Sequence, residues 1–536
     1  MLPHVEPLDG TVIERQVAIY RYPQPGDEHD ESYHYYPHLT SRLVAQLPDP
    51  RATLPYDDSL ESQLAFAGAP WLEFRRVSVV LTTLLILATW LLARRFAGER
   101  WALFAAALLA TSLLFGFYSA EMRPHGIAAT ANAFAVLACL RLLSQGSLAS
   151  YLLAGSACGL AVGALQYGVF TLPCLLVAHL LARRGEKRAW WKLALALLPV
   201  ALCVRVFYPF YFVAGESYFD VQGANLNLSG QPLKLDKFNG AGFRTIFETL
   251  CSYDPLLLVL GLGGALLLFV RALRRRSLGE RGASVLVCLA FALPYGFVTG
   301  MYAETWERFV VNLLPWFSIC AAVVFALWHT RARRPWLPVA TACALLVPML
   351  LLDCKLAQVR SAPDTLQLAA RWVECYAEPV VTRIQVLPYV DLPLFHSQAA
   401  VAESGDKPWI SRWLYNETQL APPGRAPRYD LHLPPAASDP DRLLVVQDPL
   451  AWVESRRPEL LVMTVDPSTA YLTELREGLL RRGERLARFT SRTCDEGEAS
   501  FFAGRHMFQW DDPFFLHLAR SARMGSTIEI WRPQVR

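Results

Sequence analysis

The sequence predicts an α-helical polytopic membrane protein of about ten spans, followed by a small extracytoplasmic α/β domain. Three observations lead to this fold class. Of the 536 residues, 53% are hydrophobic, which is rare in a soluble chain of this length. The apolar stretches are separated by loops that are alternately rich and poor in Lys and Arg. Behind the last stretch, short apolar runs alternate with helical patterns.

The apolar stretches define the candidate membrane spans. Several are shorter than the roughly 20 residues that a bilayer core needs, so we expect the helices to extend into their flanks. We read 151–182 as two helices with an outer turn at Gln166 and Tyr167, because one long helix would leave the basic cluster after it on the wrong side. The predicted spans are 77–93, 101–117, 126–143, 151–165, 168–182, 193–213, 255–270, 283–299, 309–328 and 336–352.

The charges in the loops fix the orientation of these spans. Alternate loops carry about 17 Lys and Arg in total, against about 5 in the loops between them, and basic loops stay in the cytoplasm. The predicted cytoplasmic loops are 94–100, 141–150, 183–192, 271–281 and 329–335. We therefore expect an integral multi-pass protein of the cell's inner or plasma membrane.

Three regions follow from this topology. Residues 1–76 form a first extracytoplasmic loop with many acidic residues, and 77–354 form the transmembrane helical domain, which includes an outer loop at 214–254. Residues 355–536 form the extracytoplasmic α/β domain. No signal peptide pattern is visible at the N-terminal end. We therefore expect that the start codon is misplaced and that one more transmembrane helix precedes residue 1.

The C-terminal region has the pattern of a small α/β domain. Asp364 is the expected N-cap of an amphipathic helix over 366–378. A second helical pattern covers 469–482. Apolar runs that are interleaved with these helices are typical of strands; they are 380–387, 443–446, 460–465, 486–489 and 527–531.

Composition excludes some functions. The net charge of +4 is small and its basic residues lie in short loops, so we expect no nucleic acid partner. The eleven cysteines lie mostly in apolar spans and show no spacing of metal ligands. We predict no metal site from the residues themselves.

Acidic and aromatic side chains gather in the first outer loop. Its candidates for chemistry are Asp9, Asp27 and Glu28, followed by Tyr36 and His38. A carboxylate that is partly desolvated at a membrane surface can act as a general base. The alternative is a solvated acidic loop, which is what runs of charge usually form.

Two further outer turns carry charged clusters. Glu121, Arg123 and His125 lie together in one, and Glu307 and Arg308 lie in the other. An arginine at this level can pair with a lipid phosphate. It can equally serve as an ordinary interfacial anchor that extends toward the headgroups. These residues, with Tyr36, His38 and Tyr167, are our candidate substrate-binding residues.

The order and sidedness of these motifs resemble the GT-C superfamily of integral membrane glycosyltransferases, above all the protein O-mannosyltransferase and lipid A aminoarabinose transferase type (family 39-like). The resemblance rests on an acidic first loop that ends in Tyr36-Pro37-His38, on Glu121-Met122-Arg123-Pro124-His125, and on Glu307-Arg308-Phe309 ahead of Leu313-Leu314-Pro315. Gln166-Tyr167 and the Asp364-Thr365 start of the outer domain add to it. The motifs extend along most of the chain.

This resemblance implies an activity. Such enzymes take a sugar from a polyprenyl-phosphate donor at the outer membrane surface and pass it with inversion to a lipid, protein or glycan acceptor. An acidic residue of the first loop is the implied general base, and a divalent cation is compatible but not required. The distance to the aromatic-Pro element favours Asp9, with the Asp27-Glu28 pair as the reserve.

The sequence departs from the family pattern at two of these positions. Gly10 stands where the family has a Glu, and His125 stands where it has an Asp. Arg308 and Arg123 are the cations that we expect to neutralise the donor's phosphate. The cytoplasmic side lacks a Gly-rich nucleotide loop, as expected if the donor is lipid-linked.

Other functions fit some of the same observations. A non-catalytic or degenerate protein of envelope glycan assembly is the main alternative, as a scaffold, a polymerase or ligase, or a flippase. A sensor that binds its ligand in the outer α/β domain is another. A transporter would more often have polar residues or repeats within its spans, whereas here Arg205 is nearly alone among ionisable groups in the spans.

Overall fold

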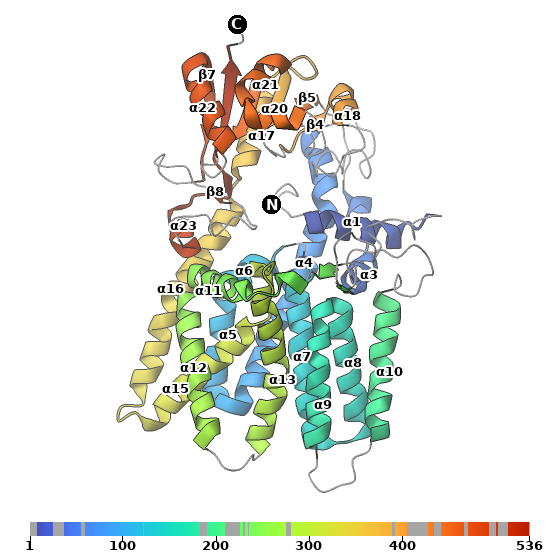
Figure 1. The fold of residues 1–536 in the computed structure, drawn as a ribbon, viewed down its shortest axis with the longest axis vertical. Coiled ribbons are helices and arrows are strands. Elements are labelled where there is room, and N and C mark those ends of the chain that lie inside the picture. The colour runs from blue at the N-terminus through green and yellow to red at the C-terminus, as the bar shows by residue number, and fades with distance from the viewer. Residues whose placement is uncertain are drawn as a thin grey trace. The chain divides into compact units, whose positions relative to one another are not determined.

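The chain forms two compact units, each described here by itself. The helical unit comprises Val12–Pro48 and Phe74–Cys354, and the sheet unit comprises Met1–Thr11, Asp49–Glu73 and Lys355–Arg536. The structure is a computed structural model, shown in Figure 1. It describes residues 8–24, 37–54, 59–121, 123–182, 190–208, 226–228, 231–233, 235–274, 280–387, 392–404, 427–433, 441–465, 470–491, 500–501 and 513–534.

Apolar helices dominate the helical unit. Each predicted span overlaps one or two of them; the spans 168–182 and 309–328 begin in shorter elements ahead of α9 and α15, and positions 209–213 lie outside the described residues. The helices are α4 (Leu60–Ala97), α5 (Glu99–Ala110), α6 (Leu113–Ser119), α7 (His125–Gln145), α8 (Leu148–Ala164), α9 (Leu172–Leu181), α10 (Trp190–Phe207), α12 (Pro255–Arg274), α13 (Glu280–Met301), α15 (Leu314–Arg331) and α16 (Trp336–Ser361).

Helix length and composition make the chain a multi-pass membrane protein. Five helical stretches are long and apolar enough to cross a bilayer, and they are Gly68–Ala97, His125–Gln145, Trp190–Phe207, Arg281–Met301 and Trp336–Tyr376. A sixth is present if α5 and α6 count as one span. Three shorter apolar helices cover Leu148–Ala164, Gln166–Leu181 and Pro255–Arg271. Within the described residues, helix length therefore supports fewer crossings than the predicted ten.

Shorter elements connect the apolar helices. As predicted, the stretch 151–182 is not one helix: α8 ends at Ala164 and α9 begins at Leu172 after a 3-10 turn. The first loop also contains helices, which we did not predict. The connecting elements are α1 (Leu8–Arg21), α3 (Leu39–Ala45), η4 (Gln166–Thr171), β1 (Leu226–Leu228), β2 (Gln231–Leu233), η6 (Leu235–Lys237), α11 (Ala241–Tyr253) and α14 (Glu307–Val310).

The predicted span 101–117 is broken by a 60° bend between α5 and α6. Asp254, at the end of α11, fixes the new helix start. Its carboxylate accepts hydrogen bonds from Ser112 Oγ at 2.7 Å and from the Leu113 and Leu114 N–H groups at 3.0 and 3.2 Å. Three of the donors at the start of α6 are thus satisfied by one buried acid. Burial raises the pKa of Asp254 to about 6, although these hydrogen bonds oppose the shift.

Three glycines of α8 allow α10 to approach closely. A Cβ atom on Gly155 would lie 1.9 Å from the Ala196 carbonyl oxygen, and one on Gly159 would lie 3.0 Å from that of Pro199. A Cβ atom on Gly163 would lie 2.4 Å from Cδ2 of the Phe207 ring. Small residues four apart let two helix backbones touch in a bilayer, where apolar burial contributes little to association.

The sheet unit is built on a six-stranded mixed sheet. Its strand order is β4-β5-β3-β6-β10-β7, with β10 antiparallel to both of its neighbours and the others parallel. The strands are β3 (Arg383–Leu387), β4 (Phe395–His396), β5 (Arg428–His432), β6 (Leu460–Thr464), β7 (Gly483–Phe489) and β10 (Ile528–Pro533). Its helices are α17 (Thr365–Tyr376), α18 (Gln398–Ser404), α20 (Asp441–Gln447), α21 (Pro449–Arg456), α22 (Ala470–Arg482) and α23 (Phe514–Arg520), and its smaller elements are η3 (Pro50–Thr53), β8 (Ser500–Phe501) and β9 (Gly525–Ser526).

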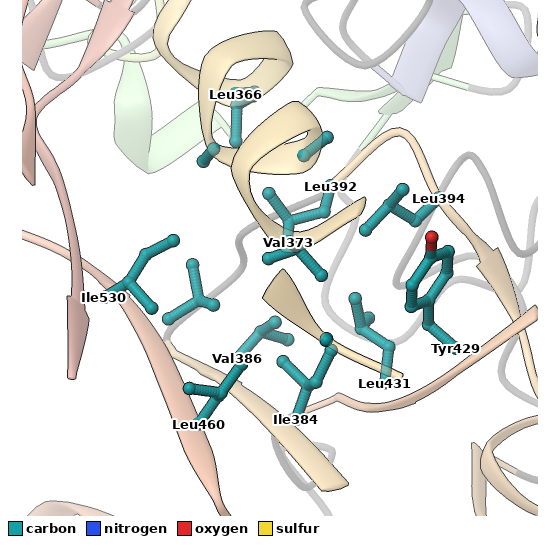
Figure 2. Packing of buried hydrophobic residues seen from close by; sticks show 14 of the residues in the cluster. Leu366, Val373, Ile384, Val386, Leu392, Leu394, Tyr429, Leu431, Leu460 and Ile530 are labelled. Atoms are coloured by element: carbon teal, nitrogen blue, oxygen red, sulfur yellow. The ribbon is translucent and has the colours of Figure 1, made fainter. Parts of the chain in front are cut away.

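Both faces of this sheet are covered because successive strand residues point to opposite sides. On β6, Leu460 and Val462 join the core under α17, which Figure 2 shows around Val373. Leu461 and Met463 join a second core under α21 and α22. The side chain of Asp364 accepts from the Gln367 N–H at 2.8 Å, so the predicted N-cap is confirmed.

One predicted strand is wrong. Residues 443–446 lie in helix α20 and not in the sheet. A short apolar run cannot by itself distinguish a strand from a buried helix. Here Val445 packs with Trp452 and Leu475 in the second core, which a turn of helix achieves as well as a strand.

The glycine contacts generate a first prediction. Gly155→Ala should lower the free energy of unfolding by about 1–3 kcal/mol, because the added methyl group must push α10 away. Gly263→Ala, in α12, is the matched control, since nothing lies within 4 Å of its added Cβ. Thermal unfolding of both variants in detergent measures the difference. Equal stability of the two variants would contradict the close approach of α8 and α10.

Candidate functional site

A cluster of charged and aromatic side chains lies where several connections of the helical unit meet. We call it the outer cluster, because these connections lie on the predicted extracytoplasmic side. In Figure 1, α6 and α11 lie across the ends of α12 and α13, and α11 contacts α6, α12, α13 and α14. The outer cluster consists of Tyr118, Glu121, Arg123, His125, Tyr167, Tyr253, Glu307 and Arg308, with Phe309.

Glu307 is the buried centre of the outer cluster. The residue begins α14, directly after the turn that follows α13, and it is 4% exposed. Its Oε2 accepts hydrogen bonds from the Tyr118 hydroxyl at 2.9 Å and the Tyr253 hydroxyl at 3.1 Å. Its Oε1 has no hydrogen-bond partner within the described part of the chain. The carboxyl therefore joins α6, α11 and α14.

The protonation of Glu307 follows from this burial. Desolvation raises its pKa to about 8, the neighbouring Glu121 carboxylate adds to the rise, and the two tyrosine hydrogen bonds and Arg123 oppose it. The side chain is thus largely neutral at neutral pH. With Glu307 neutral, the remaining charges of Glu121, Arg123 and Arg308 sum to +1, which suits an anionic ligand.

Glu121 and Arg123 form a buried ion pair in the connection between α6 and α7. Arg123 Nε lies 3.2 Å from Glu121 Oε2, and both side chains are 8% exposed. The connection is held against α4, because Ser78 Oγ donates to the Ser119 carbonyl at 2.8 Å. At Gly126 an added Cβ would lie 2.5 Å from Thr82 Cγ2. The pair therefore occupies a fixed place at the start of α7.

His125 begins α7 and faces aromatic rings. Its imidazole stacks on Phe309, with ring centroids 5.6 Å apart and an interplanar angle of 23°, and it lies 6.4 Å from the ring of Tyr167. Tyr167 in turn packs edge-on against Phe309 at 5.1 Å. The Nδ1 atom of His125 is buried and has no hydrogen-bond partner among the described residues. The aromatic wall thus contains one buried polar atom whose hydrogen-bonding capacity is not used by the described residues.

Polar side chains from the helix interiors support this wall. The Tyr295 hydroxyl donates to the Phe309 carbonyl at 2.7 Å and accepts from Asn312 Nδ2 at 3.2 Å. Asn132 Nδ2 donates to Asn312 Oδ1 at 2.9 Å. The chain of hydrogen bonds connects α7, α13 and the start of α15. Linked buried polar groups restrict how these helices can pack, although Asn132 Oδ1 has no partner among the described residues.

Arg308 is the second cation of the outer cluster. Its guanidinium lies 4.5 Å from the centroid of the Trp306 ring and 5.5 Å from that of Phe309. Both Arg308 and Arg123 interact electrostatically with His125. The two guanidinium groups therefore act on the same small region. Planar guanidinium groups are suited to binding phosphate through two parallel hydrogen bonds.

The structure brings six of the eight predicted substrate-binding residues together. These are Glu121, Arg123, His125, Tyr167, Glu307 and Arg308. His38 has a different environment, since its N–H donates to the Phe207 carbonyl at 3.0 Å and its ring contacts the Tyr20 hydroxyl. Tyr36 lies outside the described residues.

The candidate bases are not described at the level of side chains. Asp9 lies in α1, of which only the backbone is described at this position, and Asp27 and Glu28 lie outside the described residues. Among the residues that the structure does describe, no group of three or more His, Cys, Asp or Glu side chains could hold a metal ion. The assignment of a general base therefore remains a prediction.

Sequence reasoning missed several members and supports of the outer cluster. Tyr118 and Tyr253 lie in the last turns of α6 and α11 and donate hydrogen bonds to Glu307, and Asp254 accepts hydrogen bonds from the start of α6. Asn132 and Asn312 are polar residues in or beside apolar spans, a signal that could have identified them. Because these amides are uncharged, a search for ionisable groups within the spans does not detect them.

Comparison with known proteins bears on the identity of this site. Residues 63–212 match the family described as dolichyl-phosphate-mannose-protein mannosyltransferase. This match confirms the resemblance to membrane glycosyltransferases over the part of the chain that holds Glu121, Arg123, His125 and Tyr167. No curated protein matches the chain.

Solved structures resemble the chain more distantly. The crystal structure of ArnT from Cupriavidus metallidurans bound to undecaprenyl phosphate is 14% identical, covers 98% of this chain and 94% of its own, and gives a TM-score of 0.46. The oligosaccharyltransferase AglB from Archaeoglobus fulgidus, in complex with an inhibitory peptide and a dolichol-phosphate, is 13% identical, covers 90% and 69%, and gives 0.45. Both TM-scores lie below 0.5.

The buried Glu307 predicts a pH-dependent stability. Its folded pKa of about 8 lies above the ordinary 4.5, so the unfolded chain loses this proton first as the pH rises. Wild-type stability should therefore fall between about pH 4.5 and 8, by a few kcal/mol, and level off above. Glu307→Gln should lack this component, because a neutral amide does not titrate.

Thermal unfolding in detergent between pH 5 and 9 measures this difference. Glu304→Gln, in the same turn but 40% exposed at its side chain, is the matched control and should keep the wild-type pH dependence. Parallel curves for wild type and Glu307→Gln would contradict the buried neutral carboxyl.

Proposed function

We propose that this chain is a GT-C membrane glycosyltransferase that uses a polyprenyl-phosphate-linked sugar as its donor and works at the outer face of the membrane. The family match over residues 63–212 supports the class of enzyme. The observation that carries the proposal is the outer cluster, which gathers the buried Arg123, the half-buried Arg308, a neutral carboxyl and an imidazole nitrogen that has no hydrogen-bond partner among the described residues.

The donor's phosphate is the proposed ligand of the two arginines. Arg123 is oriented by its ion pair with Glu121, and Arg308 is oriented by the rings of Trp306 and Phe309. Guanidinium groups held in advance stabilise the negative charge that grows on a leaving phosphate, and they need no reorganisation at that moment. The neutral state of Glu307 keeps the local charge positive.

The aromatic wall is the proposed contact of the sugar. Tyr167, Phe309 and His125 present ring faces beside the arginines. Binding sites of this kind combine apolar and aromatic surface with a few polar groups that fix orientation. The Nδ1 atom of His125 is one such group and would meet a sugar hydroxyl.

The proposed reaction is a single displacement with inversion. A hydroxyl or amine of the acceptor attacks the anomeric carbon, the bond from that carbon to the phosphate oxygen breaks, and the polyprenyl phosphate leaves with the electron pair. A carboxylate takes the acceptor's proton. Asp9 is the proposed base and Asp27 or Glu28 the reserve, as the family resemblance implies. Glu307 is proposed as a positioning residue, since it is buried between two tyrosines.

Binding of the carrier tests the role of the arginines without knowledge of the sugar or acceptor. Arg308→Gln and Arg123→Gln should each weaken the binding of polyprenyl monophosphate about 10-fold or more, the worth of a charged hydrogen bond. Arg308→Lys should retain part of the affinity. The control Arg331→Gln lies in the last turn of α15, in the basic loop at the opposite side. Thermal stabilisation of the purified chain by the lipid is the measurement, and unchanged binding in both glutamine variants would refute the assignment.

Transfer of the sugar tests the base. Polyprenyl-phosphate mannose is the first donor to use, with membranes of the source cell as acceptor. Asp9→Asn should reduce the transfer rate by at least 100-fold while leaving polyprenyl monophosphate binding unchanged, because a general base typically contributes 10²- to 10⁴-fold. Asp27→Asn and Glu28→Gln are the comparison variants. If all three retain full transfer, the base lies elsewhere.

A further inference from the structure

A cavity lies at the predicted cytoplasmic side of the helical unit, among the ends of α4, α7 and α8. Its volume is about 640 Å³. Arg94 and Arg95 reach it from the last turn of α4, and Arg141 reaches it from α7, one turn before that helix ends. We call it the arginine cavity. It lies beside two of the loops whose basic residues mark the cytoplasmic side.

The charges around the arginine cavity are not balanced. Arg94 pairs with Glu99 at 2.6 Å, and Arg141 Nε donates to the neutral Gln145 side chain at 3.1 Å. Arg95 forms no hydrogen bond or ion pair with any residue that the structure describes. The described lining contains no Asp or Glu. Two of the three guanidinium charges therefore face the cavity without a carboxylate.

The rest of the wall is apolar. Leu91, Phe134 and Leu153 line it from three different helices, and Leu137, Ala138 and Ala157 complete the apolar part. A ligand that fits both parts has an anionic head and a hydrocarbon tail. The volume of the cavity lies within the range of small-molecule sites, about 300–1,000 Å³.

The alternative is that these arginines only anchor the helix ends at the membrane surface, but this does not explain why they line one cavity. A basic residue at the end of a span needs only water and headgroups, and it can extend away from the helices. Here guanidinium groups from helices 46 residues apart in sequence, at Arg95 and Arg141, line one cavity between helices. Basic pockets between membrane helices on the cytoplasmic side are typical sites for anionic lipid headgroups.

We propose that the arginine cavity binds an anionic phospholipid of the cytoplasmic leaflet. Its phosphate lies among Arg94, Arg95 and Arg141, and one acyl chain lies along the apolar wall. This site is distinct from the outer cluster, which belongs to the other surface of the bilayer. A phospholipid bound here stabilises the packing of α4 against α7 and α8, since it binds the folded chain only.

Thermal unfolding of the full chain in detergent, with added lipid, tests the proposal. Phosphatidylglycerol should raise the unfolding temperature, phosphatidylcholine should not, and the effect should shrink with salt. The variant Arg95→Gln/Arg141→Gln should bind phosphatidylglycerol about 25-fold more weakly, from about fivefold for each basic side chain. The matched control Arg331→Gln/Arg334→Gln removes the same charge from an exposed loop on the same side and should bind normally.

A second variant separates the cavity from the surface charge. Ala157→Phe fills the cavity without changing any charge and should also abolish the effect of phosphatidylglycerol. Equal losses in the cavity and control arginine variants would overturn the proposal, because they would indicate unspecific attraction to a basic surface. A lack of stabilisation by phosphatidylglycerol would also overturn it, and a loss of polyprenyl monophosphate stabilisation in Arg95→Gln/Arg141→Gln would assign the cavity to the sugar carrier instead. The cavity variants should leave polyprenyl monophosphate binding at the outer cluster unchanged. That binding is measured with the Arg123 and Arg308 variants, so failure of one proposal can be distinguished from failure of the other.

Discussion

The outer cluster depends on one constraint, namely that a buried carboxyl group must find hydrogen-bond donors where water is excluded. Glu307 meets it with Tyr118 and Tyr253, and so ties the end of α6 to the end of α11. Asp254, which follows Tyr253, satisfies the same constraint by accepting from three donors at the start of α6. The two acids thereby hold α6, α11 and α14 together. The arginines and aromatic rings of the outer cluster lie on or beside these helices.

The sequence was most informative where one physical rule sufficed. Hydropathy located the helices, and the sidedness of the basic loops grouped Glu121, Arg123, His125 and Glu307 before any contact was known. It could not predict the break at Ser112, because the residue that causes it, Asp254, is distant in sequence and its partners are backbone groups. For the same reason the Tyr118 and Tyr253 contacts were missed: which helix ends meet is a property of packing. The run 443–446 was assigned to a strand because its helical partners lie on another part of the chain.

The helical unit has two electrostatic environments of different character. At the outer cluster, Glu121, Glu307 and Arg123 are buried, and Arg308 is half-buried against aromatic rings, which suits a ligand that is held in one pose. At the arginine cavity, the basic residues are exposed and largely without acids, which suits attraction to a leaflet. Arginine thus occurs in two different surroundings within one helical unit, and the degree of burial distinguishes them.

The glycine contacts between α8 and α10 have a consequence for how this chain can change in evolution. Their fit is made by main-chain atoms of α10 at Gly155, by main-chain and side-chain atoms at Gly159 and by the Phe207 ring at Gly163, and it depends on the three glycines lying on one helix face. Inserting or deleting a single residue between them would turn the following glycines by about 100° around the helix axis. Side chains on the lipid-facing side of α8 can vary freely, whereas the length of this segment cannot. We therefore expect relatives to keep the number of residues here even where few of the residues themselves are shared.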